Sequence, residues 1–320
     1  HRNAPRPSST AHHRLRTPHH QDPNQEQFLG RRTFLGMSAA GTAGVGMSLL
    51  GAGPARAAQH LLNSPSTTYA VGVREYHWTR GSRQLDVFVY YPATGSPGGN
   101  PVGNAPVAKG AFPVCNFTHG LNASPQKSLA IILPLAAAGF IVPAPYFHYS
   151  GVSEVTNGQT SMDVSEILTR TLALNTGTDP LAGHIDTHAG LGVSGHSLGG
   201  MTTLGLLTRW PDSRITTAIP MSTEDMGAPA STVHAKVLFM HGTKDTTIPI
   251  SSARTAYAKM PAPKAFLTFI NGTHTSYFGD SRTRNTFLDW ARWGLYSDTA
   301  ALNRLPADAK SSGTTWQFVQ

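Results

Sequence analysis

The sequence is poor in cysteine, in charge and in aromatic residues, and each shortage narrows what the protein can be. Cys115 is the only cysteine among 320 residues, so no intramolecular disulfide can form. It lies in an apolar run, 112–117, which is typical of a buried, unreactive thiol rather than a nucleophile. Charged residues make up 13% and aromatic residues 8%, but the 39% of hydrophobic positions can still build a core. This composition excludes a disordered, collagen-like or coiled-coil chain.

Positive charge is concentrated near the start of the chain. The formal net charge is +8, but residues 1–57 hold seven arginines against only Asp22 and Glu26. Residues 58–320 hold 18 basic and 15 acidic side chains, and no two basic residues are adjacent there. A nucleic-acid-binding surface needs clustered positive charge. We therefore exclude nucleic acid as a partner.

Residues 1–57 have the pattern of an export leader. Arg31 and Arg32 precede a weakly apolar, glycine-rich stretch at 37–53, and Ala55 and Ala57 place small residues at −3 and −1 of a cleavage site. This arrangement resembles a twin-arginine signal, with cleavage after Ala57 and secretion, or release into a periplasm. A transmembrane anchor is the alternative, but six glycines between 36 and 53 make the stretch too polar for a stable span.

Residues 58–320 are predicted to form a single α/β domain around a mostly parallel sheet. Its core should cover about 69–295, with a C-terminal extension at 296–320. Two segments with alternating polarity, 71–78 and 85–91, predict an opening antiparallel pair. Beyond them, apolar runs alternate with helical segments. The pattern predicts buried strands at 114–118, 140–144, 191–194, 216–221, 237–240 and 266–270, and helices at 128–138, 162–174, 198–210, 251–260 and 284–293.

The run Gly195-His196-Ser197-Leu198-Gly199 is a G-x-S-x-G motif between a predicted strand and a predicted helix. A serine on such a tight turn has a strained backbone, and the flanking glycines leave room for it. The turn exposes the hydroxyl, and the amides at the start of the next helix point toward the reacting oxygen. The context predicts that Ser197 is a catalytic nucleophile.

A serine hydroxyl needs a base, and the base needs an acid to orient it. Asp245 follows the strand predicted at 237–240, and His274 follows the strand predicted at 266–270. Both residues should emerge at the carboxyl edge of the sheet, in the chain order serine, acid, histidine. Asp225 and Glu224, one loop earlier, are the alternative acids.

The oxyanion formed during ester hydrolysis needs two backbone N–H donors. One donor should be Leu198, directly after the nucleophile. The other should be Leu121, in the loop that follows the run Thr118-His119-Gly120. Because only the main chain donates, the two leucine side chains are free to line the acyl-binding cleft.

Several further segments carry a family resemblance: 89–92 (VYYP), 117–120 (FTHG), 138–142 (AGFIV), 185–187 (IDT) and 271–276 (NGTHTS). With the triad, they make the chain similar to the α/β-hydrolase superfamily over roughly 71–295. The resemblance is to its secreted dienelactone-hydrolase-like branch, which includes bacterial cutinases, polyethylene terephthalate hydrolases and platelet-activating-factor-acetylhydrolase-like esterases. It implies a serine ester hydrolase that forms an acyl-enzyme on Ser197 and uses no cofactor.

The expected substrate cleft is bordered by His119, Leu121, Thr223 and Glu224. About 15 residues separate the strands on either side of 222–236, too few for a helical cap domain, so the cleft should be open to bulky or polymeric esters. The sequence departs from the pattern of the polyester hydrolases at Leu121, where those enzymes carry an aromatic residue. Aliphatic esters and polyesters are therefore expected to be better substrates than aromatic polyester.

Other function classes remain as alternatives. A lipase or a platelet-activating-factor-acetylhydrolase-like esterase would use the same triad, as would a peptidase or amidase. A non-catalytic binding module on this fold usually lacks a triad member. His77, His184 and His188 are scattered singly, so no metal site is predicted. We expect a monomer without a membrane anchor that meets an ester or polyester substrate.

Overall fold

The computed structural model describes residues 63–320, so the expected leader at 1–57 lies outside the described residues. The fold begins with a long antiparallel hairpin of β1 (Ala70–Arg80) and β2 (Arg83–Ala93). Its register runs without a break from Ala70 opposite Ala93 to Arg80 opposite Arg83. Gly81 forms the turn with a φ of 59°, a conformation that costs glycine little. The predicted opening strand pair is confirmed.

Two hydrogen-bonded sheets continue from the hairpin. One has the order β3-β1-β2-β5, and the other has the order β10-β9-β8-β7-β6-β4. A parallel bridge between Val114 and Ile141 joins β4 to β5, with the Cys115 N–H donating to the Ile141 carbonyl at 2.9 Å. The strands are β3 (Val102–Gly103), β4 (Cys115–Thr118), β5 (Val142–Pro145), β6 (Leu191–His196), β7 (Ile215–Met221), β8 (Lys236–Gly242), β9 (Lys264–Phe269) and β10 (Thr314–Val319).

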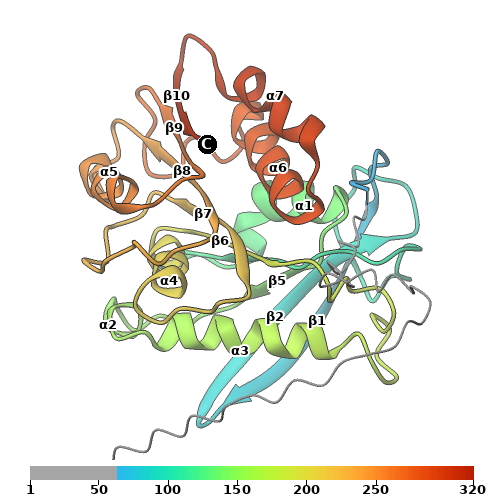
Figure 1. Ribbon diagram of the computed structural model, residues 1–320. Coiled ribbons are helices and arrows are strands. Elements are labelled where there is room, and N and C mark those ends of the chain that lie inside the picture. The colour runs from blue at the N-terminus through green and yellow to red at the C-terminus, as the bar shows by residue number, and fades with distance from the viewer. Residues whose placement is uncertain (1–62) are drawn as a thin grey trace, which may run out of the picture. The chain divides into compact units, whose positions relative to one another are not determined.

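Strands β4, β6, β7, β8 and β9 are parallel to one another, so their carboxyl ends meet at one edge of the sheet. Parallel neighbours need a crossover, and helices provide most of them (Figure 1). The helices are α1 (Leu129–Ala137), α2 (Ser153–Thr156), α3 (Gln159–Ala173), α4 (Leu198–Leu207), α5 (Ile250–Lys259), α6 (Ser281–Tyr296) and α7 (Thr299–Ala309).

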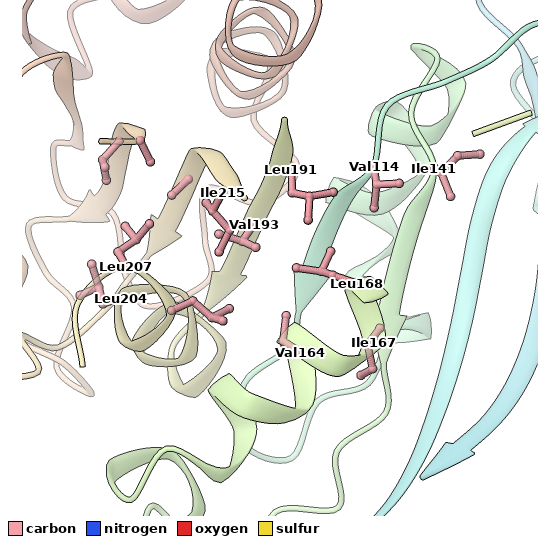
Figure 2. Packing of buried hydrophobic residues seen from close by; sticks show 14 of the residues in the cluster. Val114, Ile141, Val164, Ile167, Leu168, Leu191, Val193, Leu204, Leu207 and Ile215 are labelled. Carbon is pink, nitrogen blue, oxygen red and sulfur yellow. The ribbon is translucent and has the colours of Figure 1, made fainter. Parts of the chain in front are cut away.

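The sheet separates two hydrophobic layers. Along β8, Val237 and Phe239 belong to the layer with α3, α4 and α5, whereas Leu238 and Met240 belong to the layer with α1, α6 and α7. Figure 2 shows the first layer, where side chains of α3 such as Leu168 point toward the strands. Both faces of the parallel strands are thus covered, which explains why these strands read as continuous apolar runs. The predicted α/β-hydrolase fold class is confirmed.

The chain beyond residue 295, which the sequence analysis treats as an extension, contributes α7 and β10. Strand β10 pairs antiparallel with β9 along its whole length, from Thr314 opposite Phe269 to Val319 opposite Lys264. Helix α7 begins at an Asp298 cap whose carboxylate accepts from the Ala301 N–H, and its Leu305 is fully buried. This segment therefore completes the sheet edge next to the strand that precedes His274.

The carboxyl edge of the sheet carries no helical insertion between β7 and β8. Residues 222–235 form turns and irregular loop only. Across residues 63–320, no helix combines the length and the apolar character needed to cross a bilayer.

Candidate active site

The turn between β6 and α4 holds Ser197 in a conformation that L-residues rarely adopt, with φ of 58° and ψ of −118°. Such a strained backbone persists only where the surroundings enforce it, and it is common at functional sites. The Ser197 N–H donates to the Met221 carbonyl at 3.0 Å, and its own carbonyl accepts from Met201 at 2.9 Å. The serine therefore stands on a sharp, well-anchored turn from strand to helix.

Two glycines make this turn sterically feasible. A Cβ on Gly199 would overlap the carbonyl oxygen of Thr118, and a Cβ on Gly195 would overlap the carbonyl of Gly199. The backbone of the turn thus lies directly against the end of β4. The sequence pattern reflects this close approach, since a larger residue at either position would push the turn away from the neighbouring strand.

Asp245 and His274 meet at the same sheet edge, from loops after β8 and β9. The His274 Nδ1 lies 2.7 Å from the Asp245 Oδ2. The other carboxylate oxygen, Oδ1, accepts from the backbone N–H groups of Thr247 and Ile248, both at 2.9 Å. The carboxylate is thereby fixed at both oxygens, and it orients the imidazole of His274.

Asp245 is buried, with 7% of its surface exposed. Burial on its own would raise the pKa of this carboxyl group, but the hydrogen bonds from His274 and the Ile248 N–H outweigh it and lower the pKa below its ordinary value. The Asp245 carboxyl group is therefore ionised at neutral pH and accepts hydrogen bonds with both oxygens.

His241 lies beside the same carboxylate, with its Nε2 3.2 Å from the Asp245 Oδ2. That nitrogen also lies 2.9 Å from the Ile248 carbonyl, so it carries the proton and donates. Burial lowers the pKa of His241, which keeps the ring neutral. Its role is to support the acid loop.

The alternative acids lie elsewhere. Asp225 pairs with the Lys259 ammonium at 2.6 Å, and its N–H donates to the Ser252 hydroxyl at 2.9 Å. Glu224 is exposed. The geometry therefore favours Asp245 as the partner of His274.

The loop after β4 reaches the nucleophile turn at Gly120. A Cβ at Gly120 would lie 2.9 Å from the Ser197 Cβ, so the two backbones approach closely at this point. Leu121 follows immediately, with 48% of its surface exposed, and Leu198 is the first residue of α4, where N–H groups have no acceptor within the helix. The two predicted oxyanion donors are thus the residues directly after Gly120 and Ser197, where the two backbones approach each other, and their role as donors stays a prediction.

Two of the residues expected to border the substrate cleft are buried. Only 1% of the surface of His119 and of Thr223 is exposed. The His119 Nε2 accepts from the Phe147 N–H at 3.0 Å, so its Nδ1 carries the proton and donates to the Gly120 carbonyl at 2.7 Å. Because both nitrogens are engaged inside the protein, the expectation that His119 lines the cleft is wrong. Thr223 packs against Gly200 of α4 and does not fit that role either.

A group of aromatic rings surrounds His119 instead. Tyr146, Phe147 and Tyr149 follow β5, and their ring centroids lie 5.9, 6.5 and 5.4 Å from that of His119. The Tyr149 hydroxyl donates to the His119 carbonyl at 2.9 Å. These rings are not among the cleft residues predicted from the sequence. A run of aromatic residues directly after a buried strand is the signal that could have identified them.

Within residues 63–320, no set of three or more histidine, cysteine, aspartate or glutamate side chains converges in a way that would hold a metal ion.

Comparison with known families supports this chemistry. A family model named Chlorophyllase matches residues 91–221, which run from the end of β2 through the nucleophile turn to the end of β7. The match covers less than half of the chain and stops before Asp245 and His274. No curated protein gives a significant match. The chain is thus similar to a family of the α/β-hydrolase type, and this similarity indicates a hydrolase that acts on esters.

Proposed function

We propose that the protein is a secreted serine carboxylic ester hydrolase, similar in type to cutinases and polyesterases. The observation that carries this proposal is the 2.7 Å contact between His274 and Asp245, beside the strained turn of Ser197. The match to an ester-hydrolase family over the nucleophile turn supports the same reaction class.

The mechanism follows from the proton positions. Because the His274 Nδ1–H donates to Asp245, its Nε2 is the free base that takes the Ser197 proton. The Ser197 oxygen attacks the ester carbonyl, and the N–H groups of Leu121 and Leu198 stabilise the oxyanion. His274 then returns the proton to the departing alcohol, which leaves an acyl-enzyme. A water molecule, deprotonated by His274, releases the acid and restores the serine.

The proposed substrates are aliphatic esters of short to medium acyl length and aliphatic polyesters, with aromatic polyesters such as polyethylene terephthalate as poorer substrates. Leu121 is the exposed apolar side chain next to the nucleophile turn. Contact between this side chain and the alkyl chain of a substrate would stabilise the complex by about 0.8 kcal/mol for each CH₂ group that is fully buried. Tyr277, which could stack on an aromatic ring if exposed, is 2% exposed and faces the interior.

The experiment for the reaction class is stopped-flow hydrolysis of 4-nitrophenyl esters of graded acyl length, with the matching anilides as the peptidase control. We expect a burst of nitrophenolate equal to the enzyme concentration, since an acyl-enzyme accumulates when deacylation is slow. Faster turnover of anilides than of esters would replace the proposal with an amidase. No turnover of any ester would refute it.

Export is proposed from the sequence pattern alone. Replacing Arg31 and Arg32 by lysine should retain the precursor in the cytoplasm, and protein exported from the unchanged sequence should begin at Ala58. Undiminished secretion of the double-lysine variant would point to a different export route.

A further inference from the structure

The main-chain carbonyl of His274 is held from two sides. The His196 Nε2 lies 2.8 Å from this oxygen, and the Ser222 hydroxyl donates to it at 3.1 Å. His196 belongs to the end of β6 directly before the nucleophile, and Ser222 follows the end of β7. The backbone of the residue that acts as base is therefore tied to two neighbouring strand ends, in addition to the bond from its ring to Asp245.

The proton on His196 can be placed from its partner. A carbonyl oxygen only accepts, so the Nε2 of His196 carries the hydrogen and donates it. The ring lies 4.5 Å from the ring of His274 and meets Phe278 edge to face at 4.7 Å. Burial and the neighbouring His274 ring lower the pKa of His196 to about 3, against weaker opposing effects of the hydrogen bond to the His274 carbonyl and of Asp245. His196 is therefore a neutral donor throughout the pH range in which a serine hydrolase works.

A chain of hydrogen bonds holds Ser222, which makes the second contact with the His274 carbonyl. Ser222 donates its proton to the His274 carbonyl, and its oxygen lies 2.7 Å from the Tyr277 hydroxyl, which also lies 3.4 Å from the Met240 carbonyl. Burial raises the pKa of Tyr277, so this hydroxyl keeps its proton. Ser222 is itself fixed, since its N–H donates to the Met240 carbonyl at 2.9 Å and its φ is 42°. The chain runs from Tyr277 through Ser222 to the carbonyl.

We propose that His196 and Ser222 are positioning residues that lock the main chain of His274, so that its Nε2 stays directed at Ser197. The inference rests on the proposed function. Among the described residues, Asp245 is the side chain that hydrogen-bonds to the imidazole ring, and a ring hydrogen-bonded at one atom can swing with its backbone. A misplacement of about 1 Å in a catalytic group can reduce the rate about 100-fold. Fixing the carbonyl from two strand ends removes that freedom.

The test compares His196→Phe, which keeps an aromatic ring without a donor, with His196→Gln, whose amide can donate near the same point. For a short-chain nitrophenyl ester, we expect His196→Phe to lower kcat about 10- to 100-fold with KM changed less than about 2-fold. His196→Gln should recover most of the loss. Because His196 is neutral above pH 5, neither variant should change the midpoint of the pH dependence of kcat/KM in that range.

Ser222→Ala is the second, milder variant, since it removes one small hydroxyl and leaves His196 in place. We expect it to lower kcat about 3- to 10-fold with KM again unchanged, and it serves alone if His196→Phe fails to fold. Thermal midpoints are measured for every variant, so a rate loss is separated from a loss of folded protein.

Two results would overturn the positioning role: full kcat in folded His196→Phe and Ser222→Ala, or equal losses in His196→Phe and His196→Gln at equal thermal midpoints. Failure of the underlying function looks different, because the unchanged protein would then neither hydrolyse esters nor react with a fluorophosphonate.

Discussion

The nucleophile turn at 195–200 and the base His274 serve one reaction, but different interactions hold the turn and the main-chain carbonyl of His274 in place. The turn is fixed by steric fit, since the backbone at Gly195 and Gly199 lies against carbonyl oxygens with no room for a side chain. The His274 carbonyl accepts hydrogen bonds from His196 and Ser222, and the His274 Nδ1–H donates to Asp245, so the three partners come from three different strand ends. Steric fit tolerates almost no change, whereas a set of hydrogen bonds can be weakened one at a time.

This difference has a direct consequence for mutations. Adding a side chain at Gly195 or Gly199 should impair folding and activity severely, because one added carbon collides with the backbone. Changes at His196 and Ser222, which hold the His274 carbonyl, should give graded losses, since the remaining hydrogen bond still holds the carbonyl near its position.

The largest expected effect is that of Ser197→Ala. Removing the nucleophile should lower ester turnover by about 10⁴-fold or more, because no other group at the turn can form the acyl-enzyme. The thermal midpoint should change little, since Ser197 contributes a small side chain. Turnover and calorimetry on the same preparation check both parts, and substantial residual turnover would exclude Ser197 as the nucleophile.

Asp245→Asn should lower kcat by about 10⁴-fold, because an amide facing Nδ1 favours the wrong imidazole tautomer. The matched control is Asp225→Asn, which breaks only the pair with Lys259 and should leave kcat within about 2-fold. Steady-state kinetics of both variants decide the acid. If Asp225→Asn were the inactive one, the assignment of Asp245 would be wrong.

Gly199→Ala should destabilise the fold by roughly 2–4 kcal/mol, because its Cβ would overlap the Thr118 carbonyl and force β4 and α4 apart. Gly279→Ala is the control, since no atom of the described residues would lie within 4 Å of a Cβ at that position. Urea unfolding gives both free energies. Equal stability of the two variants would refute the steric account of the turn.

The neutral state of His196 predicts a pH dependence of stability. Its folded pKa of about 3 lies below the value near 6.5 of an unfolded histidine, so the unfolded chain binds more protons between these limits. Its contribution to stability is complete above about pH 6.5 and is lost as the pH falls toward 3, by up to about 1.4 kcal/mol per pH unit.

His196→Gln cannot take up that proton. The free energy of unfolding of the variant should therefore fall less steeply than that of the unchanged protein between pH 7 and pH 5. Urea titrations at several pH values measure the two slopes, and parallel slopes would show that His196 is not a buried neutral ring.

The smallest effect concerns aromatic polyester. Glu224 is exposed on the loop after β7, so Glu224→Trp can present a ring without displacing the core. Stacking worth about 0.5–1.5 kcal/mol would raise terephthalate release about 2- to 10-fold, with aliphatic polyester clearing unchanged. An unchanged product ratio would place aromatic recognition elsewhere, for example at Tyr146 or Phe147.

Much of the fold was predictable because its signals are local. The strands from β4 to β9 appear as short apolar runs, and five helices fall within a few residues of their predicted positions. Strand β10 and helix α7 were not predicted. Burial alternates along β10, but residue polarity does not follow it at the ends, since Thr314 is buried and Val319 is exposed, and the strand character depends on pairing with β9.

In the candidate site, too, the residues with a local sequence signal were predicted, and those that depend on distant contacts were not. Ser197, Asp245 and His274 were predicted because each follows an apolar strand in a recognisable motif. The roles of Ser222 and Tyr277 depend on contacts across 52 and 55 residues of sequence, which no local pattern encodes. His119 was misjudged for the same reason, since its burial depends on the distant aromatic rings that follow β5.

The central claim is that Ser197 is an activated nucleophile, and covalent labelling tests it most directly. The unchanged protein and Ser197→Ala are treated with a fluorophosphonate, and intact mass and peptide mapping locate the adduct. The account predicts one adduct on Ser197 in the unchanged protein and none in Ser197→Ala. An adduct on another residue, or labelling that persists in Ser197→Ala, would contradict it.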